Sequence, residues 1–461
     1  MADHPDFWRN LKGEFRAGRQ WIDRAIVLAY AIATGLTVVG FTMLAEAAYE
    51  AFVHLRSLDP WDAANVPFGM SLGVGLTLFW TPLLTLLLVW WCRRHAPFAA
   101  GSGIPQVMAA LNDDQVSEQQ LGRWVSIRMS LHKIGLVSGG LLAGLSIGRE
   151  GPTVQVGAGI MLHARRWLSP QSGIDGHDLM VAGAAAGIAA AFNTPLGGIV
   201  FALEVLSRRR GISHSALVIS AIVLSGLVAI SVFGNLTYFG RLQVQQVSLS
   251  LLWPGLLVAL AAGLGGGLFS RLIVASAQGM PDRFCRWRAA YPLRFAAGCA
   301  AGVAVIGAVT GGATAGAGYE PTRALLEGNG DVPVLFTLLK FMATWLSAWT
   351  GVPGGMFATS LSIGASLGND IALLTGVGPQ QAITLIALGM VGFLAAATQE
   401  PITAFIIVME MIAGQTMVLS LMATALLASG VSRMVTRPMY SELMLMMLPS
   451  RPDGSVAPVN R

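Results

Sequence analysis

The chain has 461 residues, of which 54% are hydrophobic and only 11% are charged. Soluble domains usually carry about 25% charged residues, so most of this sequence is expected to lie in lipid or between helices. No polar linker divides the chain, which favours one large membrane domain over several soluble ones. We attribute the net charge of +5 to basic cytoplasmic loops and expect no nucleic-acid partner, because no basic patch is interleaved with aromatic residues.

Long apolar segments recur along the whole chain. Residues 25–45 and 66–92 contain no charged side chain, and each can cross about 30 Å of hydrocarbon as a helix. The segments show no strand-like alternation and are too long for barrel strands, so the sequence predicts an all-α, polytopic membrane protein. Further apolar segments are residues 215–240, 247–270, 295–318, 382–399 and 402–429.

The sequence predicts a separate N-terminal segment at residues 1–24. Phe7, Leu11 and Phe15 recur at helical spacing among basic residues, which is typical of an amphipathic helix lying on the membrane. The segment lacks the pattern of a cleavable signal peptide. By the positive-inside rule, its basic charge favours cytoplasmic termini in a plasma (inner) membrane. The transmembrane domain is then expected at residues 25–445, followed by a short cytoplasmic tail at residues 446–461.

Glycine clusters interrupt the apolar segments. The interruptions include Gly101–Pro105, Gly148–Pro152 and Gly351–Gly355. Breaks of this kind are tolerated at membrane depth only where they line a cavity or are buried in protein. The clusters also match each other at similar spacings, since Gly148 corresponds to Gly354 and Gly101 to Gly316.

A second match supports an internal repeat. In residues 193–204 and again in residues 399–410, a proline is followed by an apolar helix that contains a glutamate. The sequence therefore predicts two repeats, at about residues 25–235 and 248–445. Broken helices in corresponding positions of two repeats indicate a transport site near the middle of the membrane.

The interruptions have the chemistry of an anion site. A helix N-terminus exposes unpaired backbone N–H groups and carries about half a positive charge, and glycine lets an anion approach these groups closely. Ser102 adds a hydroxyl donor within the first interruption. Such partial charges can bind a dehydrated anion and still release it. The alternative is that the glycines only allow close helix packing.

Glu150 is an ionisable residue inside a predicted membrane segment, and such residues are usually functional because their burial is costly. At a helix N-terminus its carboxylate can occupy the anion site, and protonation or movement of the side chain would free that site. Glu150 is therefore a candidate gate and proton acceptor. The alternative is a capping glutamate that pairs with Arg149.

Four segments together resemble the signature of the CLC family of chloride channels and chloride/proton antiporters. They are Gly101–Pro105, Gly148–Pro152, Gly354–Phe357 and Arg437–Tyr440, the last for its tyrosine. The resemblance covers nearly the whole chain and is to prokaryotic-type members without C-terminal CBS domains. It implies an all-α fold of two inverted repeats and a homodimer in the lipid bilayer with one pore in each subunit. The expected ions are chloride, other small anions and protons.

The resemblance also implies roles for individual residues. Ser102 and Tyr440 would supply hydroxyl groups to the central chloride site, and Glu150 would be the gating glutamate. Lys133 and Lys340 match basic positions that make the pore electropositive. The residues expected to bind chloride are Gly101, Ser102, Gly103, Arg149, Gly151, Gly355, Met356, Phe357 and Tyr440, with Met356 and Phe357 contributing backbone amides.

One position departs from the pattern of the proton-coupled bacterial members. They carry an internal proton-relaying glutamate directly after the residue that matches Glu204, and this chain has Val205 there. Because valine cannot titrate, the sequence favours a channel-like chloride pathway with Glu150 as its pH-sensitive gate. A chloride/proton antiporter whose protons enter by water is the alternative. A fluoride/proton antiporter is a third hypothesis, although Ser102 is the chloride-type residue.

Other functions have less support in the sequence. A membrane-embedded enzyme that uses Glu150 as a general acid would need a nucleophile or a metal nearby, and no HExxH or GxSxG motif is present. The seven histidines show no metal-ligand spacing, so neither a metal nor a cofactor is expected. Glu204 and Glu410 occupy equivalent places in the two repeats, where we expect them to bond to helix ends.

Overall fold

The computed structural model describes residues 18–58, 71–112, 118–207, 211, 215–234, 239, 249–279, 283–328, 332–333 and 335–448. Within these ranges the chain forms helices, and its one isolated bridge joins Gly148 to Gly355 in antiparallel fashion. The all-α prediction is confirmed. The amphipathic helix predicted near the N-terminus lies mostly outside the described residues, as does most of the C-terminal tail.

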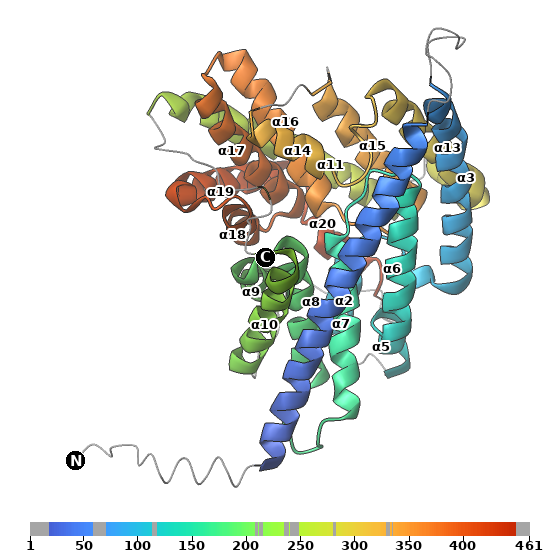
Figure 1. Cartoon of the computed structure of the whole chain (residues 1–461), viewed down its shortest axis with the longest axis vertical. Helices are drawn as coiled ribbons and strands as arrows, with labels where there is room; N and C mark the ends of the chain where they lie inside the picture. Colours follow the sequence, from blue (N-terminus) through green and yellow to red (C-terminus); the bar gives the residue numbers. More distant parts are fainter. Residues whose placement is uncertain are drawn as a thin grey trace.

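The first half of the chain runs from the longest helix to a broken pair. Figure 1 shows these elements in blue to green, with α2 crossing the molecule diagonally. The helices are α2 (Gly18–Arg56), α3 (Leu72–His95), α4 (Ile104–Asn112), α5 (Glu118–Trp124), α6 (Ile127–Leu142), α7 (Glu150–His163), α8 (Gly176–Phe192), α9 (Pro195–Phe201) with a π-helical turn at Ala202–Leu206, and α10 (Ser215–Phe233).

The second half repeats this order of elements. Its helices α15 to α19 follow one another as α6 to α10 do in the first half, and Figure 1 shows them in yellow to red. The helices are α11 (Leu252–Gln278), α12 (Arg283–Ala290), α13 (Pro292–Val309), α14 (Tyr319–Leu326), α15 (Phe336–Thr350), α16 (Phe357–Thr375), α17 (Pro379–Thr398), α18 (Pro401–Met411), α19 (Val418–Val435) and α20 (Met439–Leu445).

Among the described residues, 7 helices are long and apolar enough to cross a membrane, which agrees with a polytopic membrane protein. They are Gly18–Ser57, Leu72–His95, Ala216–Phe233, Leu252–Gln278, Pro292–Val309, Pro379–Thr398 and Gln415–Val435. The first is longer than the apolar segment in the sequence, because no proline or helix-stopping signal separates residues 18–24 from the span. α2 therefore passes without a break through the boundary expected between residues 24 and 25.

Glycines hold the innermost helices together, and they do so twice. In the pair α7 and α8, a Cβ added at Gly183 would overlap the backbone of Gly157, and one added at Gly157 would overlap that of Gly183. Gly364 and Gly389 stand in the same relation between α16 and α17. Lipid tails are as apolar as the side chains, so helices in a membrane associate largely through close backbone packing of this kind.

The broken pairs also interlock across the two halves. Asn193 and Gln399 end α8 and α17 in the left-handed conformation, which lets the chain turn directly into α9 and α18. Glu410 of α18 accepts hydrogen bonds from the N–H groups of Leu196 (3.2 Å) and Gly197 (2.7 Å) at the start of α9. A carboxylate at a helix N-terminus satisfies unpaired donors there.

Glu204 of the first repeat caps a helix of the second repeat in the same way. Its two carboxylate oxygens accept from the N–H groups of Ile402 (3.1 Å) and Thr403 (2.6 Å) at the start of α18. The prediction that Glu204 and Glu410 bond to helix ends is confirmed. Each repeat thus supplies the cap for the other, which locks the two halves together.

Candidate functional site

Two helix N-termini, one from each repeat, meet in the middle of the molecule. The N–H of Gly148 donates to the carbonyl of Gly355 (2.9 Å), and the N–H of Gly355 donates to that of Gly148 (2.7 Å). Glu150 begins α7 and Phe357 begins α16 directly after this bridge, and the two helices extend toward opposite ends of the molecule (Figure 1). The unpaired amides of both helices therefore face a shared central region.

The bridge corrects one detail of the repeat. The sequence comparison matches Gly148 to Gly354, whereas the equivalent helix starts and the bridge match it to Gly355. The offset from the first repeat to the second is one residue larger here than at the two prolines, because 45 positions separate Glu150 from Pro195 whereas 44 separate Phe357 from Pro401. The N–H of Gly354 instead donates to the carbonyl of Gly101 (3.4 Å). This hydrogen bond brings a third glycine-rich loop, Gly101–Pro105, next to the bridge.

Ser102 lies in that third loop, between two glycines with positive φ. Gly101 has φ 79° and Gly103 has φ 105°, values that residues with a side chain rarely adopt. The Ser102 hydroxyl accepts from the N–H of Ile104 (3.3 Å) at the start of α4, and Ser102 is buried. A Cβ added at Gly151 would stand 3.0 Å from the Ser102 carbonyl oxygen, so α7 and the loop are in close contact.

Tyr440 of α20 closes the central region. Its ring stacks on that of Phe357, with centroids 6.1 Å apart and an interplanar angle of 14°. Its hydroxyl is buried and makes no hydrogen bond of normal geometry in the part of the chain that the structure describes. The polar side chains near enough to influence this hydroxyl are those of Ser102, Glu400 and Glu150. The hydroxyl is therefore a buried donor directed at the region where the loops meet.

Glu150 is fully buried above this region, and its carboxylate is held on one side only. Oε1 accepts a hydrogen bond from the phenol of Tyr319, the first residue of α14. Oε2 is buried without a hydrogen bond among the described residues and lies against Gly148. A buried carboxylate oxygen without a hydrogen bond is costly, so the position of this side chain indicates a function other than stability.

Lys133 and Lys340 perform the same task in the two repeats. The Lys133 ammonium donates to the carbonyls of Ala99 (2.7 Å) and Gly101 (2.8 Å), and the Lys340 ammonium donates to those of Thr314 (2.9 Å) and Gly316 (2.8 Å). Both side chains are fully buried. Each lysine fixes a glycine-rich loop through its carbonyls, which leaves the loop amides free to face the central region and adds positive potential behind them.

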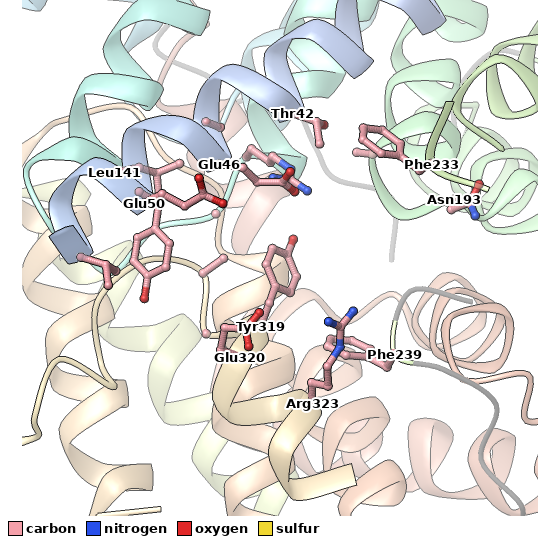
Figure 2. A pocket seen from close by; sticks show the side chains of 18 of the residues that line it. Thr42, Glu46, Glu50, Leu141, Asn193, Phe233, Phe239, Tyr319, Glu320 and Arg323 are labelled. Atoms are coloured by element: carbon pink, nitrogen blue, oxygen red, sulfur yellow. The ribbon is translucent and has the colours of Figure 1, made fainter. Parts of the chain in front are cut away.

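A cavity of about 810 Å³ adjoins the loop that precedes Glu150. Figure 2 shows it between α2, which carries Glu46 and Glu50, and α14, which carries Tyr319, Glu320 and Arg323. We call this cavity the vestibule. Gly148 and Arg149 also line it, so it reaches the loop that holds Glu150, and the half-exposed Glu46 shows that it opens to the surface.

Arg149 points into the vestibule. Its Nη1 lies 3.0 Å from Oε1 of Glu46, and its guanidinium stands over the Tyr319 ring, 5.6 Å from the ring centroid. These contacts come from α2 and α14, which the sequence places far from Arg149. The alternative role of Glu150 is that of a capping glutamate paired with Arg149. In the structure Glu46 competes with Glu150 for that pairing.

Val205 lies on the π-helical turn beside Glu204 and is buried. One group of possible metal ligands comes together in the described ranges, namely Asp175, His177 and Asp178, whose ligand atoms lie within 4.8 Å of one another. Asp175 is the N-cap of α8 and accepts from the N–H of Asp178 (2.8 Å), and His177 Nδ1 lies 3.7 Å from Asp178. Helix capping explains this cluster without a metal ion.

The sequence analysis missed two residues of the site. For Tyr319 a signal was present, because it follows a glycine-rich loop that matches the loop of Ser102. Glu400 precedes Pro401 in the second copy of the repeated segment, and its influence on the Tyr440 hydroxyl depends on the packing of distant segments. No local pattern indicates that packing.

Comparison with known proteins identifies the family. A family model described as voltage gated chloride channel matches residues 84–433. The H(+)/Cl(-) exchange transporter ClcA of Cronobacter sakazakii is 30% identical over 396 residues, covering 83% of this chain and 81% of the relative. That of Vibrio parahaemolyticus is 29% identical over 410 residues, covering 86% and 85%.

Solved structures show the same fold. A slow cyanobacterial Cl⁻/H⁺ antiporter aligns with a TM-score of 0.75 at 22% identity, over 92% of this chain and 97% of that one. A CLC-type fluoride/proton antiporter aligns with a TM-score of 0.73 at 19% identity, over the same shares of the two chains. The family model and the relatives in sequence, together with this fold, show that the chain belongs to the voltage-gated chloride channel (CLC) family.

Proposed function

We propose that this protein moves chloride across a membrane in exchange for protons, with Glu150 as gate and proton acceptor. The observation that carries the proposal is the fully buried Glu150 carboxylate at the meeting point of the helix N-termini, with one oxygen unsatisfied. A carboxylate in that place competes with an anion for the same amides. Protonation removes the competitor, which links chloride movement to a proton.

The chloride site is proposed at the centre, below Glu150. The hydroxyls of Ser102 and Tyr440, the backbone amides of Met356 and Phe357, and the loop glycines Gly101, Gly103, Gly151 and Gly355 would replace the water around the ion. These groups carry partial charges, so the ion is held without being trapped. Lys133 and Lys340 would raise the potential from behind the loops.

The names of the relatives support exchange over passive conduction. Several are named H(+)/Cl(-) exchange transporters, and the chain covers 81–85% of the two described above. Val205 favours a second candidate function, a passive chloride channel, because a valine in place of the internal glutamate offers no proton station there. Both candidates use the same pore and the same gate.

The test of the proposal is a flux measurement on the purified protein in sealed liposomes. A chloride gradient is imposed, and chloride and external pH are recorded together. Exchange predicts that chloride flow drives protons uphill. Robust chloride flux without uphill proton movement would instead establish the channel. The same assay repeated with fluoride and nitrate tests the preference for chloride that Ser102 implies.

Substitution Tyr319→Phe is expected to loosen the gate. The phenol donates to the ionised Glu150 carboxylate, and its loss makes protonation of that carboxylate easier. A hydrogen bond to a charged group contributes about 1.5–3 kcal/mol, so the midpoint of the pH profile of chloride flux should move up by about one to two pH units. Flux is measured in liposomes between about pH 4 and about pH 8, a range that begins near the ordinary pKa of a glutamate side chain and extends above neutrality.

Tyr291→Phe is the matched control, because Tyr291 is 51% exposed and lies before α13, away from the gate. Its pH profile should equal that of the wild-type protein. A Tyr319→Phe profile with an unchanged midpoint would show that the phenol does not hold the gate.

We also propose a homodimer in the plasma (inner) membrane with both termini in the cytoplasm. α9 and α18 pack on each other and leave Leu196 (53%), Leu203 (59%) and Ile402 (48%) exposed, which offers an apolar face to a second copy. Cysteine crosslinking at Leu203 in native membranes tests the dimer. Labelling of cysteines added near the two termini, from either side of the membrane, tests the orientation.

A further inference from the structure

The junction between α17 and α18 breaks the match between the repeats at one buried position. In the first repeat the left-handed Asn193 is followed by Thr194, and in the second the left-handed Gln399 is followed by Glu400. Glu400 is 3% exposed. The backbone at this junction is the same in both halves, so the turn itself does not need a glutamate. A buried ionisable side chain without a symmetric counterpart points to a function.

Glu400 is buried at the start of α18, close enough to Tyr440 for its charge to act there. It is the N-cap of α18, and its charge reaches the Tyr440 hydroxyl, which the Glu150 carboxylate also influences. One of these carboxylates comes from each repeat. Both carboxylates therefore lie near the proposed chloride site beside Tyr440.

Glu400 also lies near the place where a titratable residue is missing. Glu204, the neighbour of Val205, bonds to the N–H groups of Ile402 and Thr403 in the turn that Glu400 begins. The π-helical segment that carries Val205 is thus packed against that turn. The carboxylate of Glu400, at the start of α18, therefore lies near the π-helical turn. It can titrate there, whereas Val205 cannot.

The helices packed on this turn contribute few other charges. α17 and α9 contain no titratable residue, and α19 contains only Arg433, which is exposed. On α18 itself Glu410 is bound at the start of α9. Glu204, Tyr440 and Glu150 are among the titratable groups near Glu400 in the part of the chain that the structure describes.

This environment couples a proton to an anion. An ionised Glu400 and a chloride ion beside Tyr440 repel each other, because both are negative and lie in the protein interior, where charges are screened less than in water. Chloride binding therefore favours protonation of Glu400, and by linkage a protonated Glu400 favours chloride binding. A group with this behaviour takes up a proton each time an anion binds.

We propose that Glu400 is the internal proton station of this protein, in place of the glutamate that is absent at the position of Val205. The proposal rests on the exchange function proposed above. Glu400 takes a proton from the internal solution while chloride occupies the central site. Its O–H then gives that proton to intervening water as the Glu150 carboxylate accepts one, so that a single proton moves and no other bond changes. Glu150 is thereby neutralised and leaves the anion site.

The experiment compares proton and chloride movement by the full-length protein in liposomes for the wild type, Glu400→Gln, Glu400→Asp and Glu410→Gln. Glu400→Gln should keep chloride flux while uphill proton movement falls by about tenfold or more, since a positioned acid–base group speeds proton transfer by at least that factor. Glu400→Asp restores a carboxylate and should restore proton movement. Glu410→Gln is the matched control, because it removes a helix-capping carboxylate away from Tyr440, and it should keep the wild-type proton-to-chloride ratio.

The outcomes separate this inference from the exchange proposal. Uphill proton movement by the wild type, with an equal ratio in Glu400→Gln, would overturn the station and leave exchange intact. No proton movement by the wild type would overturn exchange and the station together. If Glu400→Gln lost chloride flux as well, proton uptake on adding chloride to the detergent-solubilised protein decides the matter. Uptake equal to that of the wild type would refute the station, and uptake reduced by about half or more would support it.

Discussion

Glu150→Gln is expected to give a protein that conducts chloride but no longer responds to pH. Glutamine has the shape of the protonated side chain and cannot ionise, so the anion site stays free of a competing carboxylate. A gate that must be protonated changes flux by up to about tenfold for each pH unit. This variation should disappear, and proton movement driven by chloride should disappear with it. Chloride flux and external pH in liposomes provide both measurements.

The control for this substitution is Glu327→Gln. Glu327 is exposed at the end of α14, the helix that begins with Tyr319, so the change removes a carboxylate from the same helix without touching the gate. Its pH response should match that of the wild type. A Glu150→Gln protein with the wild-type pH profile would refute the gate assignment, whatever its chloride flux.

Gly389→Ala is expected to have the largest effect on stability. The added Cβ would overlap the carbonyl oxygen of Gly364, and neither backbone can move without separating α16 from α17. Overpacking of this kind costs about 3 kcal/mol, which corresponds to a fall in melting temperature on the order of 5 °C or more. Tryptophan fluorescence during heating of the detergent-purified protein measures this fall.

Gly430→Ala controls for the change in helix propensity. Gly430 is also inside a helix, α19, but an added Cβ would meet nothing within 4 Å. The substitution should leave the melting temperature equal or slightly higher, because alanine favours the helix over glycine. Equal losses in the two variants would show that the α16–α17 contact is not tightly packed.

The difference between what sequence and structure reveal is clearest at Glu150. Its place at the start of a helix was predictable, because Gly148–Pro152 combines a glycine break with a proline suited to the first turn. Its hydrogen bond to Tyr319 was not, since 169 positions separate the two residues. The pairing of Arg149 with Glu46 likewise depends on α2 passing the gate.

The lysines show the same division. The resemblance pointed to Lys133 and Lys340 as sources of positive potential near the pore. The structure shows in addition that each ammonium holds two loop carbonyls. Such contacts join a helix to a loop some 30 residues away, and residue type alone does not indicate which carbonyl a lysine will reach.

The sequence by itself determined the membrane class, the broken helices and the repeat, and it singled out Glu150 as the candidate gate, because each depends on local composition or on a pattern that recurs along the chain. It also showed the absence of a titratable group at Val205. Only the tertiary structure decided which groups surround Glu150, and that the buried Glu400 is near enough to Tyr440 to influence its hydroxyl. Those contacts depend on how helices from the two repeats pack, and close backbone packing at a few glycines fixes that arrangement.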